Sequence, residues 1–284
     1  MTLTADQSAR VAETTGAEVA GSRPLPGGCI AEVLRLDLAG GGHAVAKIAP
    51  RGGLSTEAFM LQTLAARSPL RVPAVLRGDD DLLLLEYLEG GGRLDQSAQE
   101  DAAARIAALH SVPGPWFGLE RDTLIGPLHQ PNPATDSWVD FFREHRLLYM
   151  MEVARDADAL PGRTKRLLER LAGKLDRYIE EPAAPALIHG DLWSGNVLAK
   201  NGRITGFVDP AIYYADPEIE LAFSTLFATF GEPFFRRYAE LAELREGFFE
   251  VRRDLYNLYP LLVHAALFGG GYAQEVHRVA ERYA

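Results

Sequence analysis

The stretch that decides the fold class is a polar loop between two apolar segments, Leu187-Ile188-His189-Gly190-Asp191-Leu192-Trp193-Ser194-Gly195-Asn196-Val197-Leu198. Its apolar ends predict short strands at 187–188 and around 197–198, and loops framed by strands often carry catalytic groups. Asp, Asn and Gly also populate turns for purely local reasons, so composition alone leaves both interpretations open. The spacing inside the loop and a second acidic residue downstream favour a catalytic role for the loop over a purely structural turn.

Four residues separate Asp191 from Asn196. This is the spacing of the kinase catalytic loop, with His189 at the position of its His and Gly190 at that of its Arg. A second carboxylate, Asp209, ends an apolar strand where kinases place their metal-binding Asp. Phosphoryl transfer needs a carboxylate that accepts the nucleophile's proton and oxygen ligands for magnesium. We predict Asp191 as the catalytic residue, Asn196 and Asp209 as metal ligands, and His189 as a brace for the loop.

The order of predicted elements gives the fold class. Alternating residues predict a β-hairpin over 30–38 and 43–48, then a helix with Ser55 and Thr56 as candidate caps, then a buried strand over 81–86. Further helices are predicted at 99–110, 137–154 and 163–180, whereas the Pro- and Gly-rich stretch 111–136 is left unassigned. The chain is therefore predicted as an α+β, bilobal, protein-kinase-like fold with an N-terminal nucleotide-binding lobe (1–88, an antiparallel sheet plus one helix) and a larger, mainly helical catalytic lobe (89–284). Glycines 90–92 are expected to form a hinge between them.

Lys47 and Glu57 are candidates for the nucleotide side of the site. Lys47 lies on a predicted strand among apolar residues, where an inward-pointing ammonium is costly unless it is paired. Glu57, on the next predicted helix, is the natural partner, and in kinases such a pair fixes the lysine against the α- and β-phosphates. We also expect the backbone of Glu86, Tyr87 and Leu88 to pair with the adenine edge.

Two glycine clusters could cover the phosphates of a nucleotide. Gly27 and Gly28 precede the first hairpin strand, whereas glycines 40–42 lie at the hairpin tip. A loop before the strand can fold over the cleft and the tip points away, so we assign phosphate binding to Gly27, Gly28 and Cys29. Neither cluster has the G-x-G-x-x-G pattern, and no G-x-x-x-x-G-K-[ST] motif occurs in the chain.

Composition restricts the class of protein further. The chain has 284 residues and a formal net charge of -10, which argues against nucleic acid as a main partner. Cys29 is the single cysteine, so no intrachain disulfide can form, and a reducing, cytoplasmic setting is expected. Residues 1–20 lack the pattern of a secretory signal, and the apolar stretch 258–268 is too short to span a bilayer. The sequence also lacks the G-x-S-x-G and H-E-x-x-H motifs of hydrolases.

At this point the chain resembles the fructosamine/ketosamine-3-kinase family, within the wider aminoglycoside-phosphotransferase and choline-kinase-like group. The resemblance is carried by the loop 189–196, by Asp209-Pro210-Ala211 with Tyr213-Tyr214, and by strings at 27–30, 138–147 and 259–264. It extends over nearly the whole chain. Residues 215–218 read Ala-Asp-Pro-Glu where the family commonly has Gly-His, a departure that is similar to the related phosphotransferases.

The resemblance implies an activity, cofactors and partners. It implies that the γ-phosphate of ATP, with Mg²⁺, is transferred to the 3-hydroxyl of a ketosamine, either a small molecule or a protein-bound adduct of ribulose, erythrulose or fructose. The phosphorylated product then releases the amine, which is deglycation. An aminoglycoside- or choline-type phosphotransferase is the alternative. A catalytically inactive binding module would be expected to lack Lys47, Asp191, Asn196 or Asp209, and all four are present.

Five further positions have competing interpretations. Asp216, before Pro217, is typical of a helix start and could in addition brace the loop or contact substrate. Trp193 could stack on the acceptor, although large aromatic side chains usually serve packing. Trp138 and Arg146 are expected to be core and surface residues of a helix. Cys29, in a glycine-rich loop, could be a redox switch that links two copies, as the resemblance implies, or the chain could be a monomer with an inert thiol there.

Overall fold

The first lobe is built on a five-stranded antiparallel sheet with the strand order β1-β2-β3-β5-β4. The computed structural model describes residues 3–25, 31–50 and 52–284. The strands are β1 (Val19–Pro24), β2 (Glu32–Leu38), β3 (His43–Ile48), β4 (Val75–Gly78) and β5 (Leu82–Glu86). The hairpin β2–β3 and the buried strand β5 were predicted from the sequence, and β3 lies between them in the sheet. Lys47 is therefore on a central strand.

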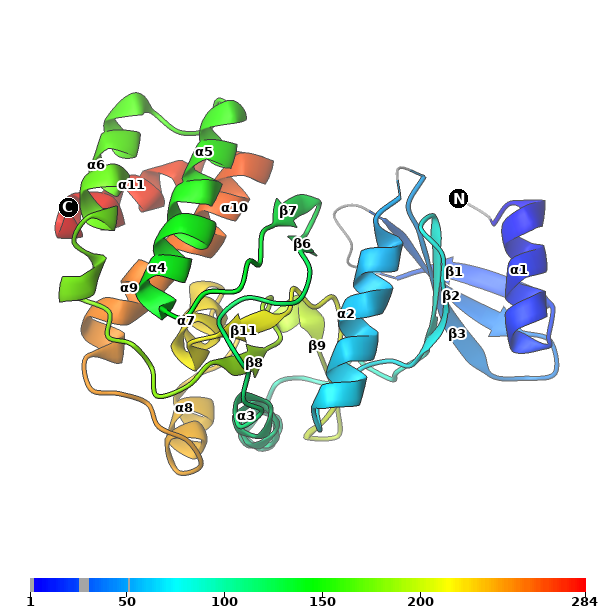
Figure 1. Cartoon of the computed structure of the whole chain (residues 1–284). Coiled ribbons are helices and arrows are strands. Elements are labelled where there is room, and N and C mark those ends of the chain that lie inside the picture. Colours follow the sequence, from blue (N-terminus) through cyan, green and yellow to red (C-terminus); the bar gives the residue numbers. More distant parts are fainter. Residues whose placement is uncertain (1–2, 26–30, 51) are drawn as a thin grey trace.

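Two helices cover opposite faces of this sheet (Figure 1), α1 (Ala5–Thr15) on the outer face and α2 (Leu54–Arg67) toward the second lobe. A small apolar cluster joins α1 to the sheet, formed by Val11, Leu34, Leu36, Ala46, Ile48, Leu82 and Leu84. Helix α1 was not predicted because Val11 is its single buried apolar residue. Its start is instead fixed by a capping box between Thr4 and Gln7.

The start of α2 corrects an expectation from the sequence. Neither Ser55 nor Thr56 is the cap: the N-cap residue is Gly53, and it has no side chain to accept a hydrogen bond. The acceptor comes from the β4–β5 turn, where Asp80 Oδ1 accepts from Gly53 N at 3.0 Å and from Ser55 Oγ at 2.8 Å. A neighbouring turn thus supplies the cap that the local sequence lacks.

The second lobe is mainly helical and lies on the other side of α2 (Figure 1). Its helices are α3 (Gln96–His110), α4 (Trp138–Phe142), α5 (Tyr149–Asp156), α6 (Gly162–Ala172), α7 (Pro217–Leu226), α8 (Glu232–Ala239), α9 (Arg253–Tyr256), α10 (Leu258–Phe268) and α11 (Gly271–Tyr283). Helices α4 and α5 are joined by a π-helical segment, Arg143–Leu148, so the predicted helix 137–154 is continuous but not regular. The helix predicted over 163–180 ends at Ala172 before Gly173.

Three two-stranded sheets complete the second lobe. They pair β8 (Ala186–Ile188) with β11 (Tyr213–Ala215), β9 (Val197–Lys200) with β10 (Arg203–Phe207), and β6 (Thr123–Ile125) with β7 (Leu128–Gln130). The hairpin β6–β7 lies in the stretch that the sequence left unassigned. Strands β8 and β9 flank the loop 189–196, as predicted, so the loop is held at both ends.

The segment between the lobes is tied down by close backbone contacts. Gly92 N donates to Ala199 O at 2.8 Å, and a Cβ at Gly92 would lie 2.6 Å from the same oxygen. Phe207 N donates to Arg71 O across the lobes at 2.8 Å. The expected hinge glycine Gly92 therefore serves a close approach of two backbones, which only a residue without a side chain allows.

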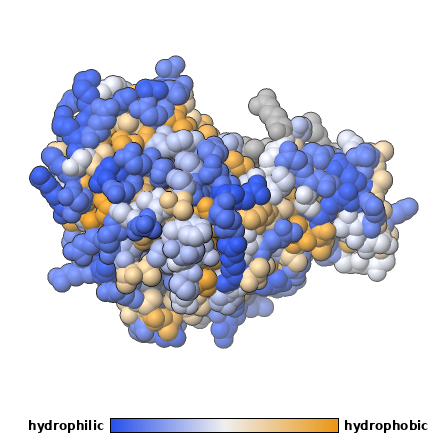
Figure 2. All heavy atoms as spheres, viewed as in Figure 1, coloured by the Kyte–Doolittle hydropathy of each residue, from blue (hydrophilic) through white to orange (hydrophobic). Residues whose placement is uncertain are grey.

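The surface shows no single dominant apolar area in the view of Figure 2, where hydrophobic residues form separated patches among hydrophilic ones. Within the described residues, none of the helices combines the length and the apolar character required to cross a bilayer. The apolar residues are instead concentrated in one large core, which extends from α2 through the helices of the second lobe.

Candidate active site

The loop between β8 and β9 brings Asp191 and Asn196 into direct contact. Asn196 Nδ2 donates to Asp191 Oδ2 at 2.8 Å and to the backbone oxygen of Asp191 at 2.9 Å. The same amide lies 3.4 Å from the backbone oxygen of Asp209. The two acids and the amide that were predicted from spacing thus gather in one place. Because the amide nitrogen is used internally, the carbonyl oxygen Oδ1 is the atom of Asn196 suited to a cation.

The surroundings of Asp191 favour its neutral form more than water does. Burial, with smaller contributions from the charges of Asp209 and Glu220, raises the pKa of Asp191 to about 7, even though the hydrogen bond from Asn196 lowers it. A carboxyl group with a pKa near neutrality is suited to accept and release a proton at physiological pH.

Asp209 lies just beyond β10 in a backbone conformation that few residues adopt. Its φ is 55°, in the left-handed region that is uncommon for residues other than glycine. The side chain of Lys47 reaches across the lobes to hydrogen-bond Asp209 Oδ1 and also donates to Glu57 Oε1 at 2.6 Å. The predicted Lys47–Glu57 contact is therefore present, and Lys47 also contacts Asp209 of the second lobe.

Lys47 keeps its charge in this environment. Its side chain is 7% exposed. Burial alone would lower the pKa of Lys47, but the charges of Asp209 and Glu57 raise it above its ordinary value. The result is an ammonium fixed between two carboxylates at the junction of the lobes.

His189 and Gly190 shape the backbone just before Asp191. His189 is fully buried, and burial lowers the pKa of its imidazole, which keeps the ring neutral. Its Nε2 lies 3.0 Å from Val208 O, and its Nδ1 lies 3.4 Å from Asp191 N. Gly190 has a φ of 86°, and a Cβ there would lie 2.0 Å from Ala211 O. No other residue fits at this position without moving the backbone.

Glu220 was missed by sequence reasoning, yet it contacts the loop directly. Its Oε1 accepts from Gly190 N at 2.6 Å, and its side chain is 0% exposed. Asp216 is the residue that the sequence suggests as a possible brace for the loop. The structure corrects this, because Glu220, one helical turn further along α7, makes that contact. Glu220 is 30 residues from Gly190 in the sequence, so no local pattern predicts their contact.

Asp216 instead holds the start of α7. It is the N-cap residue, its Oδ1 accepts from Glu218 N at 3.0 Å, and Pro217 follows in the first turn, as predicted. Its Oδ2 accepts from Tyr256 Oη at 2.7 Å and from Arg245. Because Asp216 is only 1% exposed, it is not available for contact with substrate.

Trp193 is the exposed aromatic residue of the loop. It is 37% exposed, and its ring lies 6.1 Å from that of Phe227. A Cβ at Gly195 would lie 2.3 Å from the Trp193 ring, so the indole lies against the Gly195 backbone. Gly195 thus gives Trp193 its place in the loop.

Arg146 differs from its expected surface position, since it is fully buried. Its guanidinium lies 3.8 Å from the centre of the Tyr213 ring and donates to Asn132 Oδ1 at 2.6 Å. The adjacent Gln130 donates to Ala211 O at 3.1 Å. These groups support the segment that follows Asp209. Trp138, in contrast, is a core residue as predicted.

The residues predicted to contact the adenine lie at the end of β5 and just beyond it. Glu86 ends β5, and its carboxylate accepts from Arg71 and, at 3.1 Å, from Ala74 N. Tyr87 and Leu88 follow in irregular structure, and the Tyr87 ring lies 5.5 Å from that of His43. Gly27, Gly28 and Cys29 lie outside the described residues.

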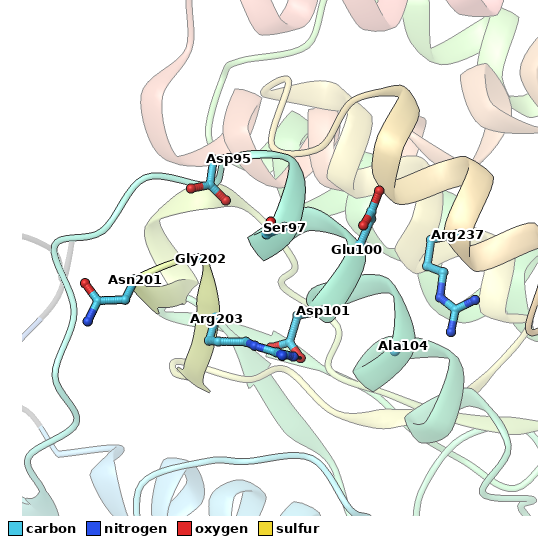
Figure 3. Close-up of a pocket in the computed structure, with 9 residues that line it drawn as sticks. All are labelled: Asp95, Ser97, Glu100, Asp101, Ala104, Asn201, Gly202, Arg203 and Arg237. Carbon is cyan, nitrogen blue, oxygen red and sulfur yellow. Dashed lines mark hydrogen bonds and ion pairs between the residues drawn. The ribbon is translucent and has the colours of Figure 1, made fainter.

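A separate hollow of about 600 Å³ lies away from these residues, between the start of α3, the β9–β10 turn and α8 (Figure 3). Its charged groups are largely paired within the chain: Asp101 accepts from Ile204 N at 2.8 Å and from Arg105 at 3.0 Å, and Asp95 caps α3. Of the residues predicted as catalytic or nucleotide-binding that lie in the described part of the chain, none lines this hollow.

Comparison with known proteins agrees with the geometry. A family model described as fructosamine kinase matches residues 1–284. A "probable ketoamine kinase" of Synechocystis is 37% identical over 238 residues, which cover 80% of this chain and 77% of that protein. A chloroplastic protein-ribulosamine 3-kinase of Arabidopsis thaliana is 31% identical over 237 residues, covering 80% and 71%.

Solved structures give the same picture at the level of the fold. The crystal structure of a protein assigned as a fructosamine-3-kinase from Thermobifida fusca has a TM-score of 0.85 and 35% identity, covering 97% of this chain and 98% of that one. A macrolide 2'-phosphotransferase from Brachybacterium faecium has a TM-score of 0.63 at 17% identity, covering 95% and 96%. The second likeness is one of fold alone.

Proposed function

The chain belongs to the fructosamine kinase family, and on that premise we propose that it is an ATP-dependent kinase of the 3-hydroxyl of ketosamines. The observation that carries the proposal is the contact of Asp191 with Asn196, close to Asp209, which accepts a hydrogen bond from Lys47. These are the groups that phosphoryl transfer to an alcohol requires, gathered at the junction of two lobes.

In the proposed reaction Asp191 is the general base. Its carboxylate accepts the proton of the acceptor hydroxyl, the hydroxyl oxygen forms a bond to the γ-phosphorus, and the bond from that phosphorus to the β–γ bridging oxygen breaks to release ADP. A pKa of about 7 allows Asp191 to be ionised in a useful fraction at neutral pH. His189 and Gly190 act through the backbone and set where Asp191 lies.

Lys47, Asn196 and Asp209 are proposed to hold the metal-bound nucleotide. The donor set fits Mg²⁺, which prefers oxygen ligands and is commonly bound by one or two carboxylates together with phosphate oxygens. When bound there by Asn196 and Asp209, Mg²⁺ would neutralise negative charge on the phosphates. Lys47 is held by Glu57 at 2.6 Å and can contact the α- and β-phosphates. We further propose that the backbone of 86–88 binds the adenine edge and that Gly27, Gly28 and Cys29 cover the phosphates.

The acceptor is proposed to be a ketosamine, either free or on a protein lysine, so that phosphorylation leads to deglycation. Two curated relatives carry the names ketoamine kinase and protein-ribulosamine 3-kinase. Trp193, exposed beside Asp191, is the proposed acceptor contact. An aminoglycoside- or choline-type activity is not favoured, because the antibiotic phosphotransferases compared here share the fold at no more than 20% identity.

Three further features complete the proposal. We propose a boundary between the nucleotide-binding lobe and the catalytic lobe at residues 88 and 89, and a cytoplasmic setting for the reaction. Cys29 is proposed as an oxidation-sensitive position that could link two copies. Mass and activity before and after mild oxidation, compared with Cys29→Ser, test the last point, and an identical response of both proteins would rule it out.

One experiment tests the proposed function directly. Consumption of ATP is measured with ribulosamine, erythrulosamine and fructosamine adducts of lysine, with an aminoglycoside and with choline, in the presence of Mg²⁺. We expect turnover of at least one ketosamine, and we expect Asp191→Ala to lower kcat by roughly 10²- to 10⁴-fold while ATP still binds. Asp156→Ala is the matched control, because Asp156 is 69% exposed and bonds to the neighbouring Arg155. Activity on choline or the aminoglycoside alone, or full activity of Asp191→Ala, would overturn the proposal.

A further inference from the structure

Glu220 has a second partner that the proposed reaction does not use. His110, the last residue of α3, has its Nε2 2.8 Å from Glu220 Oε2 and its Nδ1 2.8 Å from Tyr238 Oη on α8. The side chains of His110 and Glu220 are 2% and 0% exposed, and Tyr238 is 1% exposed. Side chains from three helices, α3, α7 and α8, thus form one buried chain of hydrogen bonds, which ends at the catalytic loop.

The direction of each hydrogen bond in this chain follows from the groups involved. Burial and then the charge of Glu220 raise the pKa of Tyr238, so its phenol keeps the proton and can donate it to His110 Nδ1. The imidazole proton is then on Nε2, which donates to Glu220 Oε2. The other carboxylate oxygen accepts from Gly190 N at 2.6 Å. Both oxygens of this buried carboxyl group therefore have a hydrogen-bond partner, as burial of such a group requires.

This chain of hydrogen bonds ends at Gly190, a closely packed residue of the loop. Gly190 is held on one side by Glu220 Oε1, and on the other side it packs so closely against Ala211 that a Cβ would lie 2.0 Å from Ala211 O. Asp191 is the next residue. Any movement of Glu220 is therefore passed through one peptide unit to the carboxylate proposed as the base.

We propose that His110 is a positioning residue for phosphoryl transfer: through Glu220 it holds the Gly190 N–H and thereby the catalytic loop in its working conformation. The inference rests on the proposed kinase function and adds to it a residue that touches neither substrate nor nucleotide. Because Lys47 and Glu57, on the proposed nucleotide side, belong to the other lobe, a substitution at His110 should change kcat more than the KM for ATP.

The test compares two substitutions of His110 that differ in hydrogen bonding. His110→Leu keeps an apolar volume but removes both hydrogen bonds, whereas His110→Gln keeps an N–H donor near the place of Nε2. We expect His110→Leu to lower kcat by roughly 10- to 100-fold, as a misplacement of about 1 Å does, with the KM for ATP changed less than about twofold. His110→Gln should recover most of that loss.

A matched control and a second readout separate positioning from general damage. Ser224 is also buried on α7, one turn beyond Glu220, and its hydroxyl donates to Leu221 O at 2.8 Å. Ser224→Ala therefore perturbs the same helix but leaves the hydrogen bonds of His110 and Glu220 in place. It should leave kcat unchanged. Hydrogen–deuterium exchange of a peptide over 187–198 should be faster in His110→Leu than in the wild type, while a peptide over 43–50 should exchange at the wild-type rate.

Several results would overturn the inference. These are wild-type kcat and wild-type exchange at 187–198 in a folded His110→Leu, an equal loss in His110→Leu and His110→Gln, or an equal loss in Ser224→Ala. If His110→Leu does not fold, Tyr238→Phe replaces it, and its kcat is expected to fall about two- to fivefold at constant KM. An unchanged kcat in Tyr238→Phe would then overturn the inference. A wild type without ketosamine kinase activity would instead sink the proposed function, and the exchange experiment would still decide the role of His110.

Discussion

Asp209 and Glu220 both contact the catalytic loop, but they are held in different ways. Asp209 is 33% exposed and is bonded to Lys47, which comes from the other lobe. Glu220 is 0% exposed and is bonded to His110 and to Gly190 N within its own lobe. The first contact can be replaced by an incoming cation, because the Asp209 side chain is partly exposed to solvent. The second is closed to solvent, and breaking it would leave a buried carboxylate without partners.

The difference separates groups that bind ligand from groups that hold the fold of the site. A residue whose partner is exchangeable can take part in a cycle of binding and release. A residue whose partners are permanent can only fix geometry. The comparison fails if the members of a class do not behave alike when they are substituted.

The largest effect is expected at Asp209, whose exchangeable contact is the proposed metal site. Asp209→Asn keeps the size of the side chain but removes the charge that would bind Mg²⁺. We expect kcat/KM for ATP to fall by about 10³-fold, because loss of one well-placed charge-stabilising group costs roughly this much. Calorimetric titration with an ATP analogue, with and without Mg²⁺, should show that Mg²⁺ no longer strengthens binding. Asp156→Asn is the exposed control, and a wild-type Mg²⁺ effect in Asp209→Asn would remove this residue from the metal site.

Lys47 should show a loss of activity together with a loss of stability. Lys47→Met removes the cation between Asp209 and Glu57 and leaves the carboxylates facing each other in a site where Lys47 itself is 7% exposed. We expect kcat/KM for ATP to fall by about 10²-fold and the free energy of unfolding to fall by about 3 kcal/mol, as when one partner of a buried pair is deleted.

The double variant separates the two effects of Lys47. In Lys47→Met/Glu57→Gln the unpaired carboxylate of Glu57 is gone, so urea unfolding should show a large part of the stability regained. Activity should stay at the level of Lys47→Met, since the phosphate-binding cation is still missing. Recovery of activity in the double variant would mean that Lys47 serves only to neutralise Glu57.

Glu218 is a buried residue with permanent partners, and the loss of stability in acid should show how much they stabilise the fold. Burial would raise the pKa of Glu218, but hydrogen bonds from Arg252 and Arg245 lower it below its ordinary value of 4.5. A carboxylate with a lowered pKa in the folded state stabilises the fold above the pKa of the unfolded chain, and this contribution is lost as pH falls through the folded value. Urea unfolding at pH 6 and at pH 3.5 should therefore show a larger loss for the wild type than for Glu218→Gln. Equal losses would mean that the two arginines do not stabilise the ionised form.

Local patterns in the sequence were sufficient for the exchangeable class. The hairpin follows from alternation of apolar and polar residues. The Lys47–Glu57 contact and the gathering of Asp191, Asn196 and Asp209 were predicted because their order and spacing match the kinase pattern. The fold class follows from the same order of elements.

The permanent class could not be found in this way. Glu220 reaches Gly190 thirty residues away and His110 at a separation of 110 residues, so the contacts depend on how α3 and α7 pack. Arg146 reads as a surface residue on a helix pattern, and it is buried because Tyr213 and Asn132 come from elsewhere in the chain. Helix α1 was missed because one buried Val11 gives no periodic signal.

The smallest effect is expected at a contact that crosses the lobes on the surface. Arg67 on α2 bonds to Glu120 of the second lobe, and both side chains are 39% exposed. An exposed ion pair contributes about 0.2–1 kcal/mol and is screened by salt. Because α2 also carries Glu57, reversal of one charge, Arg67→Glu or Glu120→Arg, should raise the KM for ATP by about two- to fivefold at low salt.

The reversed pair decides whether this contact acts through charge. Arg67→Glu/Glu120→Arg restores an ion pair of opposite polarity, so its KM for ATP should return close to the wild-type value, and the differences among all four proteins should shrink at about 0.5 M salt. Arg121, which lies 4.5 Å from the centre of the Phe59 ring, keeps α2 in contact with the second lobe in each of them. If the double variant were as impaired as the single ones at every salt concentration, shape rather than charge would hold α2, and this surface contact would belong with Glu220 among the permanent ones.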